Sequence, residues 1–504
     1  MSTVWGRVCN PVTWLMKAAF GILASMKMLT AVMSMLALSE AVMIVNPPQA
    51  LAAILRVPGN HRTIQDAIDA AAGGDVILVG MGRYYEHIDF SGKAITVTGA
   101  DPNNPTVVAA TIIDGSQKDR AVSFSSGEGR ASVLRGITIQ KAGAELSYGG
   151  IYCSGSSPTI SNCLISENQG AGIYCSESSA LIADCTISEN GDGITCWRSS
   201  PEITRCLSSK NLCCGIYCGE GSSPTIANCR ISENLSTGLS CVSSAVTVRD
   251  CTICGNNRLD GANGGGIRCL ENASPTIAGC LIVNNSSGAG GGIYCDWDCS
   301  PAISNCLIAG NSAALAGGGI LCSGNASPLI VNCLIARNSV VEGPGGGIHC
   351  DGAGTTFPYS PVLALPMPKI TNCTITQNSA SQPGGGISSF LSCPAITNCI
   401  LWADLPNEVS GRSIIITYSD IQGGYSGRGN IRANPLFTDP GNSDWHLKSG
   451  SPCINAGTAR NAPAQDNDGH PRDSHPDMGA FEHDLDHAQA PFRIFSRRDL
   501  RRKW

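Results

Sequence analysis

Aromatic residues recur at two positions of a repeated motif, either between an isoleucine and a cysteine or directly after that cysteine. Aromatic rings stack on the apolar faces of sugars, whose hydroxyl groups are bound by neighbouring polar side chains. If these rings share one exposed face, they predict a carbohydrate-binding surface. Its members are Tyr152, Tyr174, Trp197, Tyr217, Tyr294 and the nearby carboxylate Glu271. The alternative is that the rings stack only on one another and stabilise a sheet.

A second set of residues around the same motif has the types that acid–base chemistry needs. It is the densest group of charged and imidazole side chains in the repeats, and it adjoins a proline-rich insertion at residues 351–368. Long loops on a rigid scaffold are where the walls of binding sites are built. The catalytic candidates are therefore Arg268, Asp296, Asp298, His349 and Asp351.

A repeat of about 22 residues must position both sets, and a period in this range is typical of a solenoid. The consensus sequence of the repeat is Ser-Pro-x-Ile-x-Asn-Cys-x-Ile-x-x-Asn, followed by a glycine turn and Gly-Ile-x-Cys. One column of cysteines in it is Cys163, Cys185, Cys206, Cys229, Cys251, Cys280, Cys306, Cys333, Cys373 and Cys399. A second column is Cys153, Cys175, Cys196, Cys218, Cys241, Cys269, Cys295, Cys322 and Cys350.

Within each unit the apolar residues alternate with a period of two, as at Ile173 and Cys175, and the phase breaks between Ile160 and Cys163. This pattern predicts three short strands per rung, joined by Gly, Asn, Ser and Pro turns, with Ile and Cys pointing inward. Helical solenoids need rungs of roughly 33 residues or more with a period of 3.6. The unit resembles the right-handed parallel β-helix repeat proteins, the superfamily that includes pectate lyases and many bacterial surface proteins. We therefore expect an all-β, right-handed parallel β-helix.

The resemblance implies a chemistry for the catalytic candidates. Lyases of this superfamily bind Ca²⁺ through acidic residues at a uronate carboxylate and use Arg or Lys to take a proton, which this cluster could imitate. Asp296 and Asp351 would lie two rungs apart, about 10 Å, so Asp298 would have to complete a cation site. A further Ca²⁺ candidate is the pair Asp466 and Asp468, for which an Asx turn is the alternative. The acid set of polygalacturonases is not recognisable.

A short amphipathic helix is expected at residues 63–72, with Thr63 as the N-cap and Asp66 at the capping-box position. The first strand is expected at residues 74–80. The sequence of this helix and strand resembles the N-terminal cap and first rungs of pectate-lyase-like β-helices. The helix would cover the end of the core and the sheet edge exposed there.

Residues 1–55 are read as a bacterial-type export segment, with apolar runs beside Lys17 and Lys27 and a small-x-small site near Ala52. The true start would be Met26, and the alternative is a membrane anchor. Residues 56–430 are assigned to the β-helix, and 486–504 to a basic, disordered tail. Residues 431–485 are similar to the choice-of-anchor Q segment of exported β-helix proteins. We expect a secreted or cell-surface protein, in contact with membrane only through an uncleaved export segment.

Twenty-six cysteines in an exported chain invite a disulfide interpretation. Both columns occupy inward positions that isoleucine shares, so they are expected to be buried free thiols. The better candidates for disulfides lie outside the columns: Cys213, Cys214, Cys254, Cys299 and Cys393. The net charge of -6 offers no basic field for nucleic acid.

These observations predict an exported protein that binds extracellular polysaccharide or a cell-surface glycan without turning it over. The first alternative is a calcium-dependent polysaccharide lyase or glycosidase. The second is a structural or adhesive rod that has no ligand groove.

Overall fold

The computed structural model describes residues 52–143, 149–257, 261–296, 298–352 and 366–483. By its internal contacts the chain divides into Met1–Ala52 and Ala53–Trp504, and the second unit contains every described helix and strand. Most of the expected export segment, the basic tail and most of the proline-rich insertion lie outside the described residues. Over the described ranges, no helix is long and apolar enough to cross a membrane.

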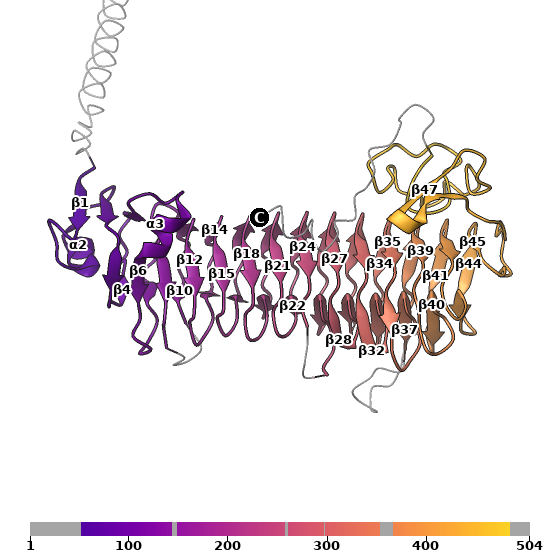
Figure 1. Ribbon diagram of the computed structural model, residues 1–504, viewed down its shortest axis with the longest axis horizontal. Helices are drawn as coiled ribbons and strands as arrows, with labels where there is room; N and C mark the ends of the chain where they lie inside the picture. The colour runs from indigo at the N-terminus through magenta and orange to yellow at the C-terminus, as the bar shows by residue number, and fades with distance from the viewer. Residues whose placement is uncertain (1–51, 144–148, 258–260, 297, 353–365, 484–504) are drawn as a thin grey trace, which may run out of the picture. The chain divides into compact units, whose positions relative to one another are not determined.

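The second unit is a parallel β-solenoid of about 13 turns, in which each turn gives one strand to each of three sheets (Figure 1). Each strand pairs in register with the equivalent strand of the next turn, so that Ile151 lies beside Ile173 and Cys153 beside Cys175. The expected parallel coil of three short strands per rung is therefore confirmed.

The three sheets are named A, B and C in the order in which a rung visits them. Sheet A contains β1 (Ile54–Val57), β2 (Val76–Val79), β5 (Thr96–Gly99), β8 (Val133–Arg135), β11 (Thr159–Ser161), β14 (Leu181–Ala183), β17 (Glu202–Thr204), β20 (Thr225–Ala227), β23 (Thr247–Arg249), β26 (Thr276–Ala278), β30 (Ala302–Ser304), β34 (Leu329–Val331), β38 (Lys369–Thr371), β41 (Ala395–Thr397) and β44 (Ile415–Thr417). Sheet B contains β3 (Gly82–Tyr84), β6 (Thr111–Asp114), β9 (Thr138–Gln140), β12 (Leu164–Ser166), β15 (Thr186–Ser188), β18 (Leu207–Ser209), β21 (Arg230–Ser232), β24 (Thr252–Cys254), β27 (Leu281–Val283), β31 (Leu307–Ala309), β35 (Leu334–Ala336), β39 (Thr374–Thr376), β42 (Ile400–Trp402) and β45 (Asp420–Ile421). Sheet C contains β4 (Ile88–Asp89), β7 (Val122–Phe124), β10 (Ile151–Ser154), β13 (Ile173–Ser176), β16 (Ile194–Trp197), β19 (Ile216–Gly219), β22 (Leu239–Val242), β25 (Ile267–Leu270), β29 (Ile293–Cys295), β33 (Ile320–Ser323), β37 (Ile348–Asp351), β40 (Ile387–Phe390) and β43 (Val409–Ser410).

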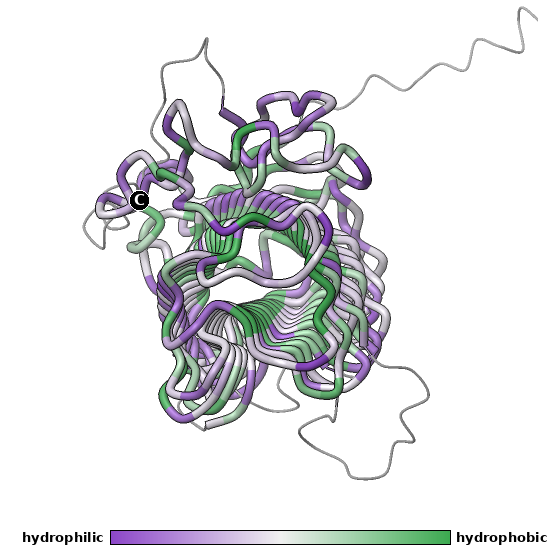
Figure 2. The backbone as a smooth tube through the Cα atoms, turned by 90° about the vertical axis from the view of Figure 1, so that its right-hand side faces the viewer, coloured by the Kyte–Doolittle hydropathy of each residue, from purple (hydrophilic) through white to green (hydrophobic). Residues whose placement is uncertain are grey.

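The core is made of the inward columns, and Figure 2 shows the stacked rungs with hydrophobic bands along them. Ile160, Ile165, Ile173 and Cys175 are fully buried, as the period of two predicts. The cysteines of both columns are buried free thiols. The expectation for the cysteine columns is therefore confirmed, whereas Cys254 and Cys393 outside the columns do not form the disulfides suggested for them.

A buried asparagine ladder runs along the turn between sheets B and C. In each step the Nδ2 and backbone N–H of one asparagine donate to Oδ1 of the next, as from Asn234 to Asn256 at 2.8 and 3.1 Å. Such ladders satisfy buried amides and fix the register of the rungs. The members are Asn168, Asn190, Asn211, Asn234, Asn256, Asn285, Asn311, Asn338 and Asn378.

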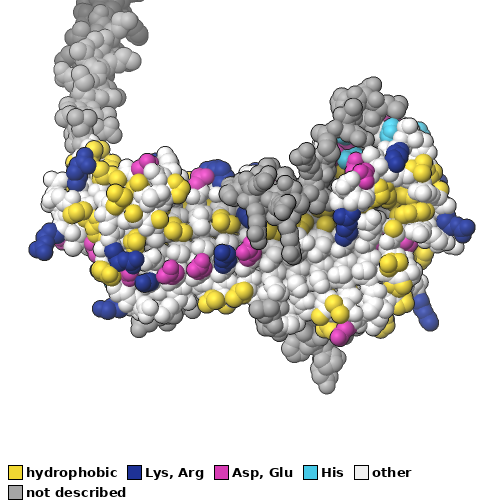
Figure 3. Space-filling model, viewed as in Figure 1, with side chains coloured by type: hydrophobic (Ala, Val, Ile, Leu, Met, Phe, Trp, Pro, Cys, Tyr) yellow, Lys and Arg dark blue, Asp and Glu magenta, His cyan; other side chains and the backbone are white. Residues whose placement is uncertain are grey.

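Many corners of the rungs are formed by non-glycine residues with positive φ. The corner between sheets B and C includes Glu167 (φ 57°), Glu189, Lys210 and Glu233, all exposed. Figure 3 shows charged side chains in a row along the solenoid. A left-handed conformation costs such residues roughly 1–2 kcal/mol each, so the stacking of the rungs must hold them there.

At the N-terminal end, the helix α2 (Ile64–Ala70) has Thr63 as its N-cap, whose hydroxyl accepts from the backbone N–H of Asp66. The helix buries Ile64, Ala67 and Ile68 and packs against β1, β2 and β4. The first strand is β1, which precedes the helix, and not the expected strand at residues 74–80. The role of α2 as a cap of the solenoid stays a prediction. A second helix, α3 (Pro105–Ala110), packs beside β6 and β9.

Residues 434–483, here called the C-terminal segment, pack on the outer face of sheet B. They include the antiparallel pair β46 (Phe437–Asp439) and β47 (Asp444–Leu447), joined by the 3-10 helix η2 (Pro440–Asn442). Trp445 and Phe481 share an apolar cluster with Leu334 and Ile400 of sheet B.

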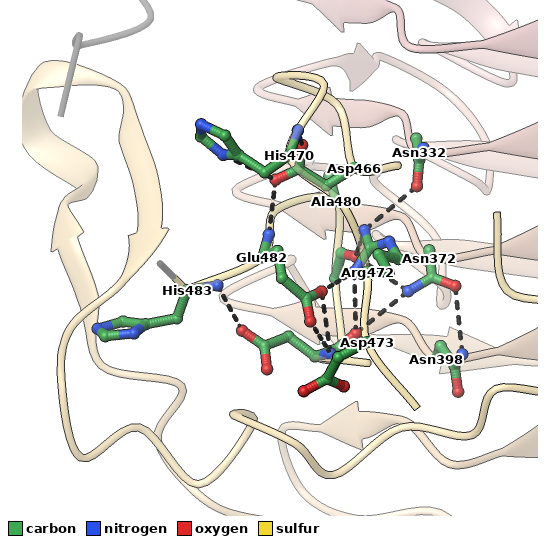
Figure 4. A network of polar contacts seen from close by, with 12 residues as sticks. Asn332, Asn372, Asn398, Asp466, His470, Arg472, Asp473, Ala480, Glu482 and His483 are labelled. Atoms are coloured by element: carbon green, nitrogen blue, oxygen red, sulfur yellow. Dashed lines mark hydrogen bonds and ion pairs between the residues drawn. The ribbon is translucent and has the colours of Figure 1, made fainter. Parts of the chain in front are cut away.

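Polar contacts to corner asparagines hold the C-terminal segment at its other side (Figure 4). The side chain of Arg472 is buried, pairs with Glu482 at 2.6 Å and donates to Oδ1 of Asn332. Asn372 donates to the carbonyl of Asp477, and Asn398 donates to that of Thr458. Burial and the charge of Asp477 raise the pKa of Glu482 to about 7, although Arg472 acts in the opposite direction.

Candidate functional site

The outer face of sheet C carries most of the residues that the sequence singles out. Strand register places Tyr152 beside Tyr174, Tyr174 beside Thr195 and Thr195 beside Tyr217. The same column continues through Ser240 and Arg268 to Tyr294. Because alternate residues of a strand face opposite sides, the whole column points away from the core.

The N-terminal half of this column is open to solvent. Tyr152, Tyr174 and Tyr217 are half-buried, as is Trp197 in the neighbouring outward column. The rings of Tyr152 and Tyr174 stack with their centroids 5.9 Å apart, and the guanidinium of Arg120 lies 4.5 Å from the Tyr152 centroid. Stacked rings with a cation on the end ring form a rigid aromatic surface.

Charged corner residues flank the open rings on the side where sheet C ends. Glu177, Arg198, Glu220 and Glu271 all have positive φ, between 48° and 54°, and equivalent places in their rungs. Arg198 lies 3.8 Å from Glu220, and Glu271 accepts from Ser243 at 3.2 Å. Burial, followed by nearby charges that include that of Glu271, raises the pKa of Tyr217.

A fourth sheet covers the C-terminal half of the column, which corrects the expectation of a fully exposed stripe. Sheet D contains β28 (Ser286–Ala289), β32 (Ser312–Ala316) and β36 (Ser339–Val340), which come from the glycine-rich insertions. Tyr294 is 2% exposed and His349 is 7% exposed, while Leu321 between them is completely buried. Tyr294 is therefore not part of an open surface.

Glycines allow sheet D to approach sheet C so closely. A Cβ on Gly290 would lie 2.7 Å from Cβ of Tyr294, and one on Gly345 would lie 2.6 Å from Cβ of His349. Both glycines also have positive φ. The glycine-rich insertions therefore fold back over the outward side chains.

The catalytic candidates do not form one open cluster. Asp296 is buried and accepts a hydrogen bond of 2.6 Å from the Tyr294 hydroxyl. The register Tyr294–Leu321–His349 places a buried leucine between the Asp296 group and the His349 group.

The other three candidates differ in how far solvent reaches them. Arg268 and Asp351 are half-buried, and Asp298 is exposed at a corner with a φ of 60°. Burial lowers the pKa of His349, against the effect of Asp351. An imidazole under a covering sheet is not placed to exchange protons with a bound polymer.

The suggested cation ligands Asp466 and Asp468 are occupied by protein donors. Oδ1 of Asp466 accepts from the backbone N–H groups of Asp468 and His470 at 2.9 and 2.8 Å, which is an Asx turn. Its Oδ2 accepts from the Glu482 N–H at 2.7 Å, and Asp468 bonds to His446 at 2.8 Å. Over the described ranges, no group of three or more His, Cys, Asp or Glu residues is arranged to hold a metal ion.

Fold and surface together define a three-sheet parallel β-solenoid with aromatic residues on one sheet face. The chain belongs to the family of the right-handed beta helix region, whose model matches residues 87–207, 149–300, 192–360 and 255–421. These matches together span more than half of the chain. No curated protein matches the sequence.

Several solved structures are similar to this chain. Pectate lyase Pel9A is 16% identical over 86% of this chain and 96% of its own, with a TM-score of 0.39. The A-module of mannuronan C-5 epimerase AlgE4 from Azotobacter vinelandii is 16% identical over 74% and 95%, with a TM-score of 0.36. The catalytic domain of a GH87 alpha-1,3-glucanase, in complex with nigerose, is 14% identical over 73% and 69%, with a TM-score of 0.37. At these identities the likeness concerns the fold alone.

Proposed function

We propose that this protein binds an extracellular polysaccharide or a cell-surface glycan through the open part of sheet C. The observation that carries this proposal is the pair of stacked, half-buried rings of Tyr152 and Tyr174, which Tyr217 extends along the solenoid. Neighbouring rungs are about 4.8 Å apart, so two or three rungs roughly match the length of a disaccharide repeat. A chain lying along the solenoid would pass Tyr152 and Tyr174 in neighbouring rungs and Tyr217 two rungs further on, with Thr195 between.

The charged corner residues beside the rings supply the polar groups that a sugar-binding surface needs. Glu177, Arg198, Glu220 and Glu271 lie beside the rings, where carboxylates accept from sugar hydroxyls and the guanidinium donates to them. Both signs of charge are present, so the surface suits hydroxyl-rich chains more than strongly anionic ones.

Binding without turnover is favoured over catalysis because the acid–base candidates are covered or separated. The carboxylate of Asp296 accepts a hydrogen bond from the Tyr294 hydroxyl, and His349 is buried with a lowered pKa. The alternative, a calcium-dependent lyase or glycosidase, would require sheet D to open. In keeping with the sequence, we propose export of the chain to the cell surface or beyond, and a choice-of-anchor Q-like identity for residues 431–485.

Titration of the pure protein with neutral and acidic polysaccharides in affinity electrophoresis tests the proposal. Tyr174→Ala and Tyr217→Ala are expected to weaken binding by about two- to tenfold each, since an aromatic contact contributes roughly 0.5–1.5 kcal/mol beyond its buried area. Tyr85→Ala is the matched control, because Tyr85 is 69% exposed and lies outside the stripe. Equal binding by all three variants would refute the proposed surface.

The catalytic alternative has its own readout. With calcium and uronate polymers, a lyase would release unsaturated products that absorb in the ultraviolet. We expect none; products that disappear in Asp296→Asn would replace the binding function with a lyase.

A further inference from the structure

A cavity of about 420 Å³ lies where the C-terminal segment meets the end of sheet B. The solenoid lines it from β39 and β42, and the C-terminal segment lines it from β46 and the residues around that strand. The lining residues are Thr376, Gln377, Trp402, Ala403, Asn434, Leu436, Phe437, Pro440 and Lys448. The cavity is thus on a different sheet from the tyrosines, and neither part of the chain forms it alone.

Its walls combine apolar and polar residues, and the ring of Trp402 is part of them. Trp402 is half-buried, Phe437 is 9% exposed, and Leu436 and Pro440 lie beside them. Pockets of a few hundred cubic ångströms with apolar walls and a small number of polar groups are typical sites for small ligands.

The polar groups of the lining present hydrogen-bond donors. Arg337 donates to Oε1 of Gln377 at 2.9 Å, which leaves the Gln377 amide NH₂ without a partner among the described residues. The backbone N–H of Leu436 donates to Oδ1 of Asn434 at 3.0 Å. The side-chain NH₂ group of Asn434 is therefore also without a partner among the described residues. In both side chains the oxygen is occupied and the donor end is free.

Lys448 gives the cavity a positive charge. It is exposed and forms no ion pair within the described part of the chain. The carboxylate of Asp439 is bound to Asn442 at 2.7 Å, and the pKa of Asp439 is lowered by this hydrogen bond first and by Lys448 to a smaller extent. No Asp or Glu lines the cavity.

We propose that this cavity binds a single anionic sugar unit, carboxylated or sulfated, with its apolar face on Trp402. Two amide NH₂ groups and one ammonium group would donate to the anionic group and the adjacent hydroxyls. A neutral sugar would lose the charge-assisted part of the contact, and an inorganic anion would lose the ring contact.

The test is calorimetric titration of the full-length protein with D-galacturonate, D-galactose 6-sulfate, D-galactose and inorganic sulfate. We expect one or both anionic sugars to bind at least about tenfold more tightly than galactose and sulfate, and the two anionic probes separate carboxylate from sulfate recognition. Equal affinity for galactose and the anionic sugars, or no binding of either anionic sugar, would overturn the proposal.

Gln377→Glu is the most informative variant, because a glutamate can still accept from Arg337 while it replaces the amide donor by a negative charge. It should abolish binding of the anionic sugars with an unchanged melting temperature. The matched control is Gln382→Glu, an exposed residue outside the cavity. Tyr174→Ala should bind these sugars normally, so this proposal and the sheet C proposal can fail independently.

Discussion

Asp404 ends the asparagine ladder by accepting two hydrogen bonds from Asn378. The backbone N–H and Nδ2 of Asn378 lie 2.7 and 2.8 Å from Oδ1 of Asp404. The backbone N–H of Asp404 in turn donates to Glu408. Oδ2 of Asp404 and Oε2 of Glu408 are buried, and no other described group bonds to them. A proton shared between the two carboxyl groups would satisfy both.

This pair makes stability depend on pH. Burial, followed by Glu408, raises the pKa of Asp404 well above its usual range, and burial also raises the pKa of Glu408. An unfolded aspartate releases its proton near pH 4, whereas the folded pair keeps one, so the free energy of unfolding falls as pH rises above about 4. Asp404→Asn should remove most of this decrease, because its amide can donate to Glu408. Thermal melts from pH 5 to pH 9 measure the difference; an unchanged pH slope would contradict the shared proton.

His446 links two parts of the C-terminal segment through its charge. Nδ1 lies 2.6 Å from Asp444 and Nε2 lies 2.8 Å from Asp468. Burial alone would lower the pKa of His446, but the bonds to Asp468 and Asp444 outweigh burial and raise it. The stabilisation is complete below about pH 6.5 and is lost as pH rises through the folded pKa. An NMR titration of the ring should give a pKa above 6.5 that drops in Asp468→Asn; a normal pKa in the wild type would contradict this.

Arg472 is expected to hold the C-terminal segment on sheet B. Arg472→Ala leaves Glu482 and the oxygen of Asn332 buried without their cation, a change that costs about 3–5 kcal/mol at buried pairs. The solenoid has its own core, so we expect local release of the segment. Hydrogen exchange should rise in residues 434–483 and stay unchanged in the rungs. The exposed Arg460 supplies the control Arg460→Ala; protection of the segment in both variants would refute this role.

Because the column cysteines are free thiols, we expect a reducing agent to have no effect on the thermal stability of the protein. The cysteines of both columns are unpaired, so denaturation and alkylation without reductant should modify every one of them. The melting temperature should be the same with and without a reducing agent. Mass spectrometry that finds a cysteine pair protected from alkylation until reduction would contradict the structure.

Local repetition explains what could be predicted from the sequence. Isoleucines and cysteines such as Ile173 and Cys175 repeat with a period of two within each strand, so their inward direction follows from the pattern. The burial of Tyr294 could not be predicted in this way. Sheet D consists of Ser, Gly, Ala, Leu and Val residues whose pairing across rungs leaves no strong alternation. The only available signal was the lengthening of the rungs.

The docking of the C-terminal segment could not be predicted from the sequence for a different reason. Asn332, Asn372 and Asn398 occupy the same corner as Asn162 and Asn228, and all five have positive φ. Asn332, Asn372 and Asn398 form hydrogen bonds with the C-terminal segment. Nothing in the neighbouring amino-acid sequence distinguishes them from the other two asparagines. The junction cavity depends on this docking, so it too was outside the reach of sequence patterns.

Stacked cysteines without covalent links have a consequence for how such a chain can change in length. Neighbouring rungs meet through contacts of the same kind, and the cysteines of the two columns need no particular distant partner. Duplication or loss of a whole rung therefore leaves no column cysteine without a disulfide partner. Growth of the coil by tandem copying of its coding unit would be tolerated best at turns that contact neither sheet D nor the C-terminal segment.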